Sequence, residues 1–238
     1  MTASSPTRHL ADEHFVEYLA GTATPSAALA VACHLSLCAE CAGRGRALEA
    51  IGGAFLEEAS PAPLAPGALE HAFEHGFEHA LEELMGRIDQ AVVRPDPAPS
   101  VDAVAERLLL PFGVPRVVLP FLAPAAATSG WRRLVPGITH LELTIGTPTT
   151  VARLVKLRPG LEIPLHDHAD TEYTVIFSGA LTDDQGKFSR GDLSIRAAGE
   201  RHVQRVDDVD ACVALVINEG PLVPLTWKGR ILKRISGI

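Results

Sequence analysis

The sequence predicts a multidomain protein, with a helical N-terminal half followed by an all-β C-terminal half. Its 238 residues exceed one average domain. Apolar residues recur at helical spacing up to about residue 57, and short β-rich runs divided by Gly-containing turns fill the chain after residue 112. Hydrophobic residues make up 47% and charged residues 21%. These values are ordinary for globular proteins, so they exclude a disordered chain and a collagen-like fibre.

The first half of the chain predicts a four-helix unit. Apolar residues at helical spacing begin at Leu10, a break follows at 21–25, and the spacing resumes after Ser26. The Pro-rich segment 60–67 is a second break, and a helix of about 20 residues is expected to start near Ala68. We therefore expect a first domain at residues 1–95.

The segment 94–100 is rich in proline and predicts a stiff, extended linker. We expect the linker to cover residues 96–112 and to carry one short helix at 101–110, which Pro111 closes. The second domain is expected at 113–238. Its β-rich runs are 117–119, 141–145, 151–157, 172–177, 193–196 and 212–217. Many short strands with Gly-containing turns predict a sandwich or a barrel.

The negative charge is concentrated in the first domain. Residues 1–95 carry five Arg, no Lys and thirteen acidic side chains, whereas the remaining 143 residues carry sixteen basic and sixteen acidic ones. This imbalance would repel nucleic acid and attract a basic partner, such as a protein that itself binds DNA. The longest apolar run, 117–127, is too short to cross a bilayer, and the N-terminus has no apolar export segment. We expect a cytoplasmic protein that binds neither membrane nor DNA.

Three residues of the segment 33–41 share a helical face: His34, Cys38 and Cys41 are related as i, i+4 and i+7. An imidazole and two thiols at one point suit tetrahedral Zn²⁺, which needs a fourth ligand in a structural site. The candidates for the fourth ligand are His9, His14 and Cys33. Cys33 points away from that face, and His9 would tie the first helix to this one. The alternative is a set of small, buried core residues, and the added histidine favours metal.

This spacing, with a histidine 25 residues before His34, resembles the zinc-binding anti-sigma domain that inhibits group IV (ECF) sigma factors. The resemblance covers about residues 5–90. It implies a structural zinc held by His9, His34, Cys38 and Cys41. It also implies an ECF sigma factor as the partner, which agrees with the acidic charge of this domain.

The helix expected after residue 68 has an apolar stripe on one face. The stripe consists of Leu69, Phe73, Phe77, Leu81, Leu84 and Ile88. Such a stripe is either core or a docking surface for a partner. The Pro-rich hinge before it, and the use of the fourth helix by anti-sigma relatives, favour docking through Phe73, Phe77, Leu81 and Leu84. The histidines of the opposite face alternate with glutamates and are interpreted as a solvated surface.

A second group of metal-binding side chains lies in the β-rich half. His166 and His168 fall on the same face of a predicted strand, and Glu172 and His202 follow at fixed spacing. Three imidazoles and a carboxylate from neighbouring strands would bind a metal and leave positions open for water or a ligand. The alternative is that alternate polar residues of a strand simply face solvent.

The spacing resembles the two cupin motifs. The first, Gly-x5-His-x-His-x3-4-Glu-x6-Gly, is matched at every defined position. In the second, Gly191, Gly199 and His202 match, Ala197 replaces the usual proline, and Val206 replaces the final asparagine. The resemblance implies a double-stranded β-helix barrel that holds Zn²⁺ or another divalent transition metal.

A zinc anti-sigma domain followed by a cupin resembles the ChrR family of anti-sigma factors. The resemblance implies a protein without catalytic residues that releases its sigma factor in response to singlet oxygen or related oxidants. Two alternatives stay open. One is a cupin metalloenzyme, an Fe(II)-dependent dioxygenase or isomerase, with accessory helices. The other is a metal-dependent small-molecule sensor with no sigma-factor partner.

Overall fold

The computed structural model describes residues 6–60, 81–86, 101–146 and 149–226. The chain divides into two compact units. The first consists of Met1–Glu49 together with Val101–Ile238, and the second of Ala50–Ser100. The first helices therefore belong to the same unit as the β-rich half. The domain boundaries expected from the sequence, 1–95, 96–112 and 113–238, stay a prediction.

The N-terminal segment forms helices α1 (Asp12–Leu19), α2 (Pro25–Leu35) and α3 (Ala39–Glu58). The predicted break between the first two is confirmed. Thr24 caps α2 by accepting a hydrogen bond from Ala27 N at 3.2 Å, and Pro25 occupies the first turn. Residues 81–86 are helical, and the rest of the predicted fourth helix lies outside the described residues.

Of the described helices, none alone is long and apolar enough to span a membrane; only the pair α2 and α3, bent by 117°, passes that test when taken together.

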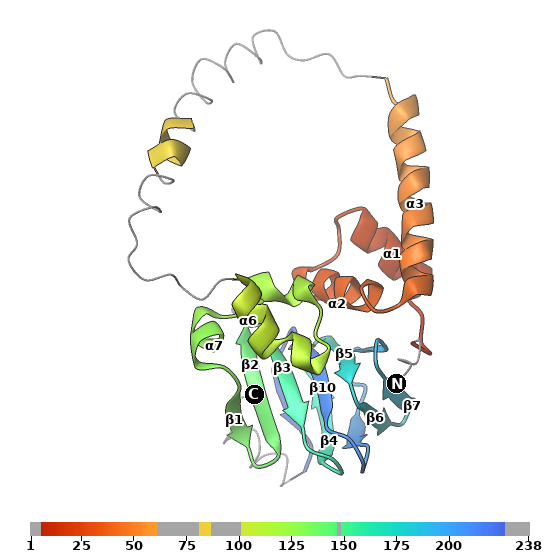
Figure 1. Ribbon diagram of the computed structural model, residues 1–238. Helices are drawn as coiled ribbons and strands as arrows, with labels where there is room; N and C mark the ends of the chain where they lie inside the picture. Colours follow the sequence, from red (N-terminus) through yellow and green to blue (C-terminus); the bar gives the residue numbers. More distant parts are fainter. Residues whose placement is uncertain (1–5, 61–80, 87–100, 147–148, 227–238) are drawn as a thin grey trace. The chain divides into compact units, whose positions relative to one another are not determined.

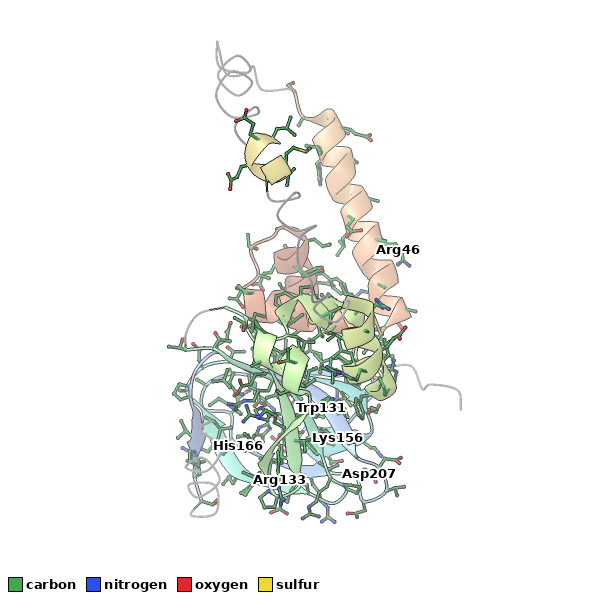
Figure 2. All side chains as sticks on the ribbon, turned by 60° about the vertical axis from the view of Figure 1, so that its left-hand side comes forward. Arg46, Trp131, Arg133, Lys156, His166 and Asp207 are labelled. Atoms are coloured by element: carbon green, nitrogen blue, oxygen red, sulfur yellow. The ribbon has the colours of Figure 1, made fainter. Side chains whose placement is uncertain are left out.

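Four short helices precede the strands: α6 (Val101–Leu108), η2 (Leu110–Phe112), η3 (Arg116–Phe121) and α7 (Pro124–Ser129). The predicted helix at 101–110 is confirmed, but the β-rich run at 117–119 is not a strand. Pro115 precedes this 3₁₀ turn and Pro120 lies inside it, and proline has no N–H to donate to a β-ladder. Trp131, labelled in Figure 2, donates from its indole Nε1 to the Leu108 carbonyl at 3.1 Å.

Within the residues that the structure describes, eleven named strands form two antiparallel sheets. The strands are β1 (Arg132–Val135), β2 (Ile138–Leu143), β3 (Val151–Leu157), β4 (Glu162–His168), β5 (Glu172–Ser178), β6 (Ala180–Asp183), β7 (Gly186–Ser189), β8 (Leu193–Arg196), β9 (His202–Val206), β10 (Cys212–Asn218) and β11 (Leu222–Pro224). The six-stranded sheet has the order β1-β2-β3-β10-β5-β8, and the five-stranded sheet has the order β11-β4-β9-β6-β7. The predicted runs at 151–157, 172–177, 193–196 and 212–217 coincide with β3, β5, β8 and β10, and the run at 141–145 overlaps the end of β2. Figure 1 labels β2, β3, β5 and β10.

The six-stranded sheet is covered on both faces, which explains why β5 is buried almost throughout. Val175 and Phe177 pack in a cluster with residues of α2 and α6, whereas Ile176 packs in a second cluster with residues of the five-stranded sheet. A third cluster holds Phe15 of α1 together with residues of α2 and α3. Helix α2 therefore packs on the β-sandwich through one apolar cluster, and α1 packs with α2 and α3 through another.

Candidate metal centres

The first candidate centre lies where the N-terminal segment meets the corner between α2 and α3. His9, Cys38 and Cys41 each offer a ligand atom within 4.8 Å of the others. His9 Nδ1 lies 3.5 Å from the sulfur of Cys38 and 3.5 Å from that of Cys41. Both thiols are buried. Three of the four side chains implied by the anti-sigma resemblance thus come together, although their residues are up to 32 positions apart.

The distances fit a tetrahedral zinc ion. With Zn–S bonds of about 2.3 Å and Zn–N bonds of about 2.0–2.1 Å, a tetrahedral angle separates sulfur from nitrogen by about 3.6 Å. The other ring nitrogen of His9, Nε2, lies 3.3 Å from the carboxylate of Glu40. A carboxylate at Nε2 favours a proton on that atom and leaves the Nδ1 lone pair facing the thiols. The three donor atoms suit a zinc ion, and so does the Glu40 carboxylate beside His9.

His34 is buried beside this group but is not one of its three members. The sequence predicted a single helical face for His34, Cys38 and Cys41, and that premise is wrong because α2 ends at Leu35 and α3 begins at Ala39. At the corner, Ser36 Oγ donates to the Cys33 carbonyl at 2.7 Å. Such a side-chain hydrogen bond to the backbone competes with a continuing helix.

The two ring nitrogens of His34 have different surroundings. Nδ1 lies 2.7 Å from the Gly191 carbonyl oxygen and donates to it, whereas Nε2 is buried with no hydrogen-bond partner. A metal-binding histidine typically donates one N–H to a carbonyl and presents the other nitrogen to the metal. Burial lowers the pKa of His34, so the neutral ring that a metal requires is favoured. The free Nε2 therefore fits the ligand role that the resemblance implies.

The neighbouring Cys33 has different surroundings. Its side chain is fully buried and belongs to the apolar cluster that joins α2 to the β-sandwich. Burial raises the pKa of the Cys33 thiol to about 12. Cys33 is also not a member of the group formed by His9, Cys38 and Cys41.

The second candidate centre lies inside the β-sandwich. It consists of His166 and His168 on β4, Glu172 on β5 and His202 on β9, all buried and with ligand atoms within 4.8 Å of one another. Figure 2 shows His166 among the strands. His166 and His202 are register partners on adjacent strands, so their side chains lie on the same face of the sheet.

The distances in the second centre also suit a metal. His202 Nε2 lies 2.9 Å from His166 Nε2 and 3.2 Å from His168 Nε2. Two ligand nitrogens at about 2.1 Å from a metal are separated by about 3.0 Å at a right angle and about 3.4 Å at a tetrahedral angle. Glu172 Oε1 lies 3.8 Å from His202 Nε2. The four donors could therefore surround one ion.

Groups outside the second centre determine which ring nitrogen of each histidine faces the metal position. His166 Nδ1 lies 2.9 Å from the Pro164 carbonyl, and His202 Nδ1 lies 3.3 Å from the carboxylate of Asp183. If both rings donate through Nδ1, their Nε2 atoms are both acceptors and cannot hydrogen-bond each other. A cation between them would satisfy both lone pairs. The side chain of Asp183 is itself fully buried and accepts a hydrogen bond from Arg196 at 2.6 Å.

Burial shifts the pKa values of this centre strongly. It lowers the pKa of His166 to about 4 and raises the pKa of Glu172 to about 7. A bound cation would offset the cost of the buried Glu172 carboxylate, because it supplies the missing positive charge. Beside His166 and Glu172 lies a largely apolar cavity of about 100 Å³. The centre therefore combines metal donors with room for a small molecule.

Comparison with known proteins covers both halves of the chain. The family model for the ChrR cupin-like domain matches residues 123–223. The anti-sigma-E factor ChrR of Cereibacter sphaeroides is 30% identical over 214 residues, which cover 90% of each protein. This chain belongs to the ChrR family of anti-sigma factors. A chain in the crystal structure of Rhodobacter sphaeroides SigE in complex with the anti-sigma ChrR matches 89% of this chain and 98% of its own length, with 27% identity and a TM-score of 0.60.

The structure of this ChrR-family chain adds residues that the sequence did not single out. The carboxylate of Asp183, which pairs with Arg196, lies beside His202 Nδ1. The Gly191 carbonyl contacts His34 Nδ1. Asp183 was not singled out from the sequence, and Gly191 was noted only as part of a cupin motif. Nothing in their spacing indicated contact with a metal ligand. The roles of the predicted ligands themselves stay predictions.

Proposed function

We propose that this ChrR-family protein sequesters an ECF sigma factor and releases it when the cupin half senses singlet oxygen or a related oxidant. The observation that supports it best is the similarity to the anti-sigma ChrR over 90% of the chain, which includes both halves. The SigE complex identifies the partner of that relative. The family role is regulatory, which favours this function over that of a cupin dioxygenase or isomerase. Because a sigma factor acts on the transcription machinery, the proposed location is the cytoplasm.

The second unit offers an apolar surface for the sigma factor. The second half of α3 exposes Ile51, Phe55 and Leu56 by 54%, 69% and 77%, and residues 81–86 expose Leu81 and Leu84 by about half. Exposed large apolar side chains in such number mark interaction surfaces in soluble proteins. Leu81 and Leu84 are the described members of the predicted docking stripe, and Phe73 and Phe77 lie outside the described residues. The acidic charge of residues 1–95 suits a basic, DNA-binding partner.

Replacing Leu84 by glutamate should weaken binding of the sigma factor without unfolding the protein. Leu84 is half exposed, so the change costs little in the free protein but buries a charge in the complex. We expect the dissociation constant to rise at least tenfold, about 1.4 kcal/mol. Titration of a labelled sigma factor measures this change. The matched control is Glu83→Gln on the same turn, and equal binding by Leu84→Glu and this control would contradict the proposed surface.

We further propose Zn²⁺ in the first centre, held by His9, Cys38, Cys41 and His34, and Zn²⁺ or another divalent transition metal in the second. The first ion would act as a structural tie between the N-terminal segment and the α2–α3 corner. A metal in the second centre supplies a Lewis acid with coordination positions open to a small molecule. Within the chain, Pro164 and Asp183 orient the imidazoles, and the apolar cavity limits access of water.

The carboxylate of Asp183 should tune the metal affinity of the second centre. An amide in its place would present a donor or a weaker acceptor to His202 Nδ1, and would so disturb the tautomer that binds metal. For Asp183→Asn we expect metal affinity to fall by about 10- to 100-fold, measured by competition with a chelator. Asp184→Asn is the control, because Asp184 also pairs with Arg196 at 2.6 Å but is 60% exposed. If both variants keep the affinity of the parent protein, Asp183 has no such role.

A further inference from the structure

Asp192 is a buried carboxylate that contacts the N-terminal segment across 185 positions of sequence. It lies in the turn between β7 and β8, and its side chain is fully enclosed. Its Oδ1 accepts hydrogen bonds from the backbone N–H of Thr7 at 2.8 Å and of Arg8 at 2.9 Å. Its Oδ2 accepts from Ser189 N at 2.8 Å and from the Thr7 hydroxyl at 3.2 Å. The carboxylate therefore joins the N-terminal segment to the cupin sandwich.

The bonded residues directly precede a predicted metal ligand, His9. The side chain of Arg8 strengthens the attachment, because its guanidinium lies 4.0 Å from the centre of the Phe188 ring and donates to the Gln185 carbonyl. The backbone and one side chain of the residue before His9 are thus both fixed to the sandwich. This attachment limits where the imidazole of His9 can lie.

The same turn also holds His34. The Gly191 carbonyl, one residue before Asp192, accepts from His34 Nδ1 at 2.7 Å. The turn approaches the N-terminal segment so closely that a Cβ on Gly191 would lie 2.4 Å from Pro6 Cγ, and Gly191 has a φ of +88°. A left-handed glycine is needed for this approach. His9 and His34 are therefore both placed by residues of one turn of the cupin sandwich.

We infer that the β7–β8 turn completes the first metal centre: Asp192 is the positioning residue for His9, and the Gly191 carbonyl orients His34. This inference rests on the proposed binding of metal by that centre. Its consequence is that the helical centre depends on the cupin half for its geometry. The thiols come from the helical corner alone, whereas the imidazoles are aligned by the sandwich.

The turn is also connected to the second centre. Gly191 N donates to the Ile176 carbonyl at 2.7 Å, and Ile176 N donates to the Asp192 carbonyl at 3.1 Å. Ile176 belongs to β5, which carries Glu172, and β8 runs from the turn to Arg196, the register partner of Glu172. A displacement of β5 or β8 at the second centre would move the turn that places His9 and His34. This connection gives the cupin half a physical route to the helical centre.

Cobalt substitution of the full chain tests the inference. Co²⁺ bound to thiolates gives a charge-transfer absorption band that a site of histidines and a carboxylate lacks, so the band reports the first centre alone. We expect Asp192→Ala to release Co²⁺ from this centre to excess chelator at least tenfold faster. Loss of a group that orients a metal ligand typically lowers metal affinity by about 10- to 100-fold. Arg8→Ala, which removes only a half-buried side chain, should accelerate release less. Metal in the second centre should be retained in both variants.

One control separates positioning from damage to the fold. Asp210→Ala removes an exposed carboxylate, and it should release Co²⁺ as the parent protein does. Unchanged release in Asp192→Ala and Arg8→Ala would overturn the inference. Equal loss of metal from both centres in both variants would overturn it as well. Absence of the thiolate band in the parent protein would instead overturn the proposed metal itself.

Discussion

Alanine at Cys38 should remove metal from the first centre and abolish sequestration of the sigma factor. Cys38 supplies one of two buried thiols at the corner between α2 and α3, 3.5 Å from His9 Nδ1. Structural zinc contributes on the order of 10 kcal/mol to the folding of small domains. Loss of a ligand should therefore release the N-terminal segment from the corner. We expect the metal content to fall by one ion per chain, and binding of the sigma factor to weaken at least about 100-fold, or 2.7 kcal/mol.

Cys33→Ala is the matched control for this experiment. Cys33 is also buried, but it packs in the apolar cluster between α2 and the sandwich. Its replacement leaves a small cavity, which should cost about 1 kcal/mol of folding stability and no metal. Elemental analysis and sigma-factor titration of the two variants give the comparison. Normal sigma-factor binding by a metal-depleted Cys38→Ala protein would contradict the structural role of the first centre.

Alanine at His166 or His202 should have the opposite effect: binding of the sigma factor persists, but its release is blocked. Both histidines belong to the second centre inside the sandwich, and neither is one of the exposed apolar residues proposed to contact the sigma factor. A signal can release the partner only if it stabilises the free form more than the bound form. Without the second metal, this difference should disappear. We expect release of the sigma factor after exposure to singlet oxygen, generated by an illuminated dye, to slow at least about tenfold.

The control for these variants is His140→Ala. His140 is a buried histidine on β2 and is not a member of the second centre. Its replacement tests whether loss of any buried imidazole in the sandwich impairs release. The division of labour between the two halves is wrong if His166→Ala no longer binds the sigma factor while His140→Ala does. It is also wrong if His166→Ala releases the sigma factor at the normal rate.

The sequence predicted most of the fold because its signals are local. Helical spacing and the break at 21–25 gave α1 and α2, and the β-branched runs gave strands such as β5 and β10. The histidine pair of β4 was placed on one face of a strand by its spacing alone, and the structure confirms this strand. Short strands with few β-branched residues, such as β6 and β7, carried no comparable signal.

The predictions from sequence were wrong where prolines or tertiary contacts outweigh the secondary-structure preference of the residues. The run 117–119 is rich in β-formers, but the flanking prolines impose a 3₁₀ turn. The segment from His34 to Cys41 has helical spacing throughout, yet the chain turns at Ser36. The contact of Asp192 with Thr7 and Arg8 joins residues 184 and 185 positions apart. A single sequence has no pattern that predicts such a pair.

Stoichiometric inhibition is the most direct measurement of the proposed role. Transcription by RNA polymerase with an ECF sigma factor from the same genome would be titrated with the full, metal-loaded chain. We predict that transcription ends at one chain per sigma factor, and that it resumes when singlet oxygen is generated. Undiminished transcription at a severalfold excess of the metal-loaded chain, for every ECF sigma factor of that genome, would contradict the proposed function.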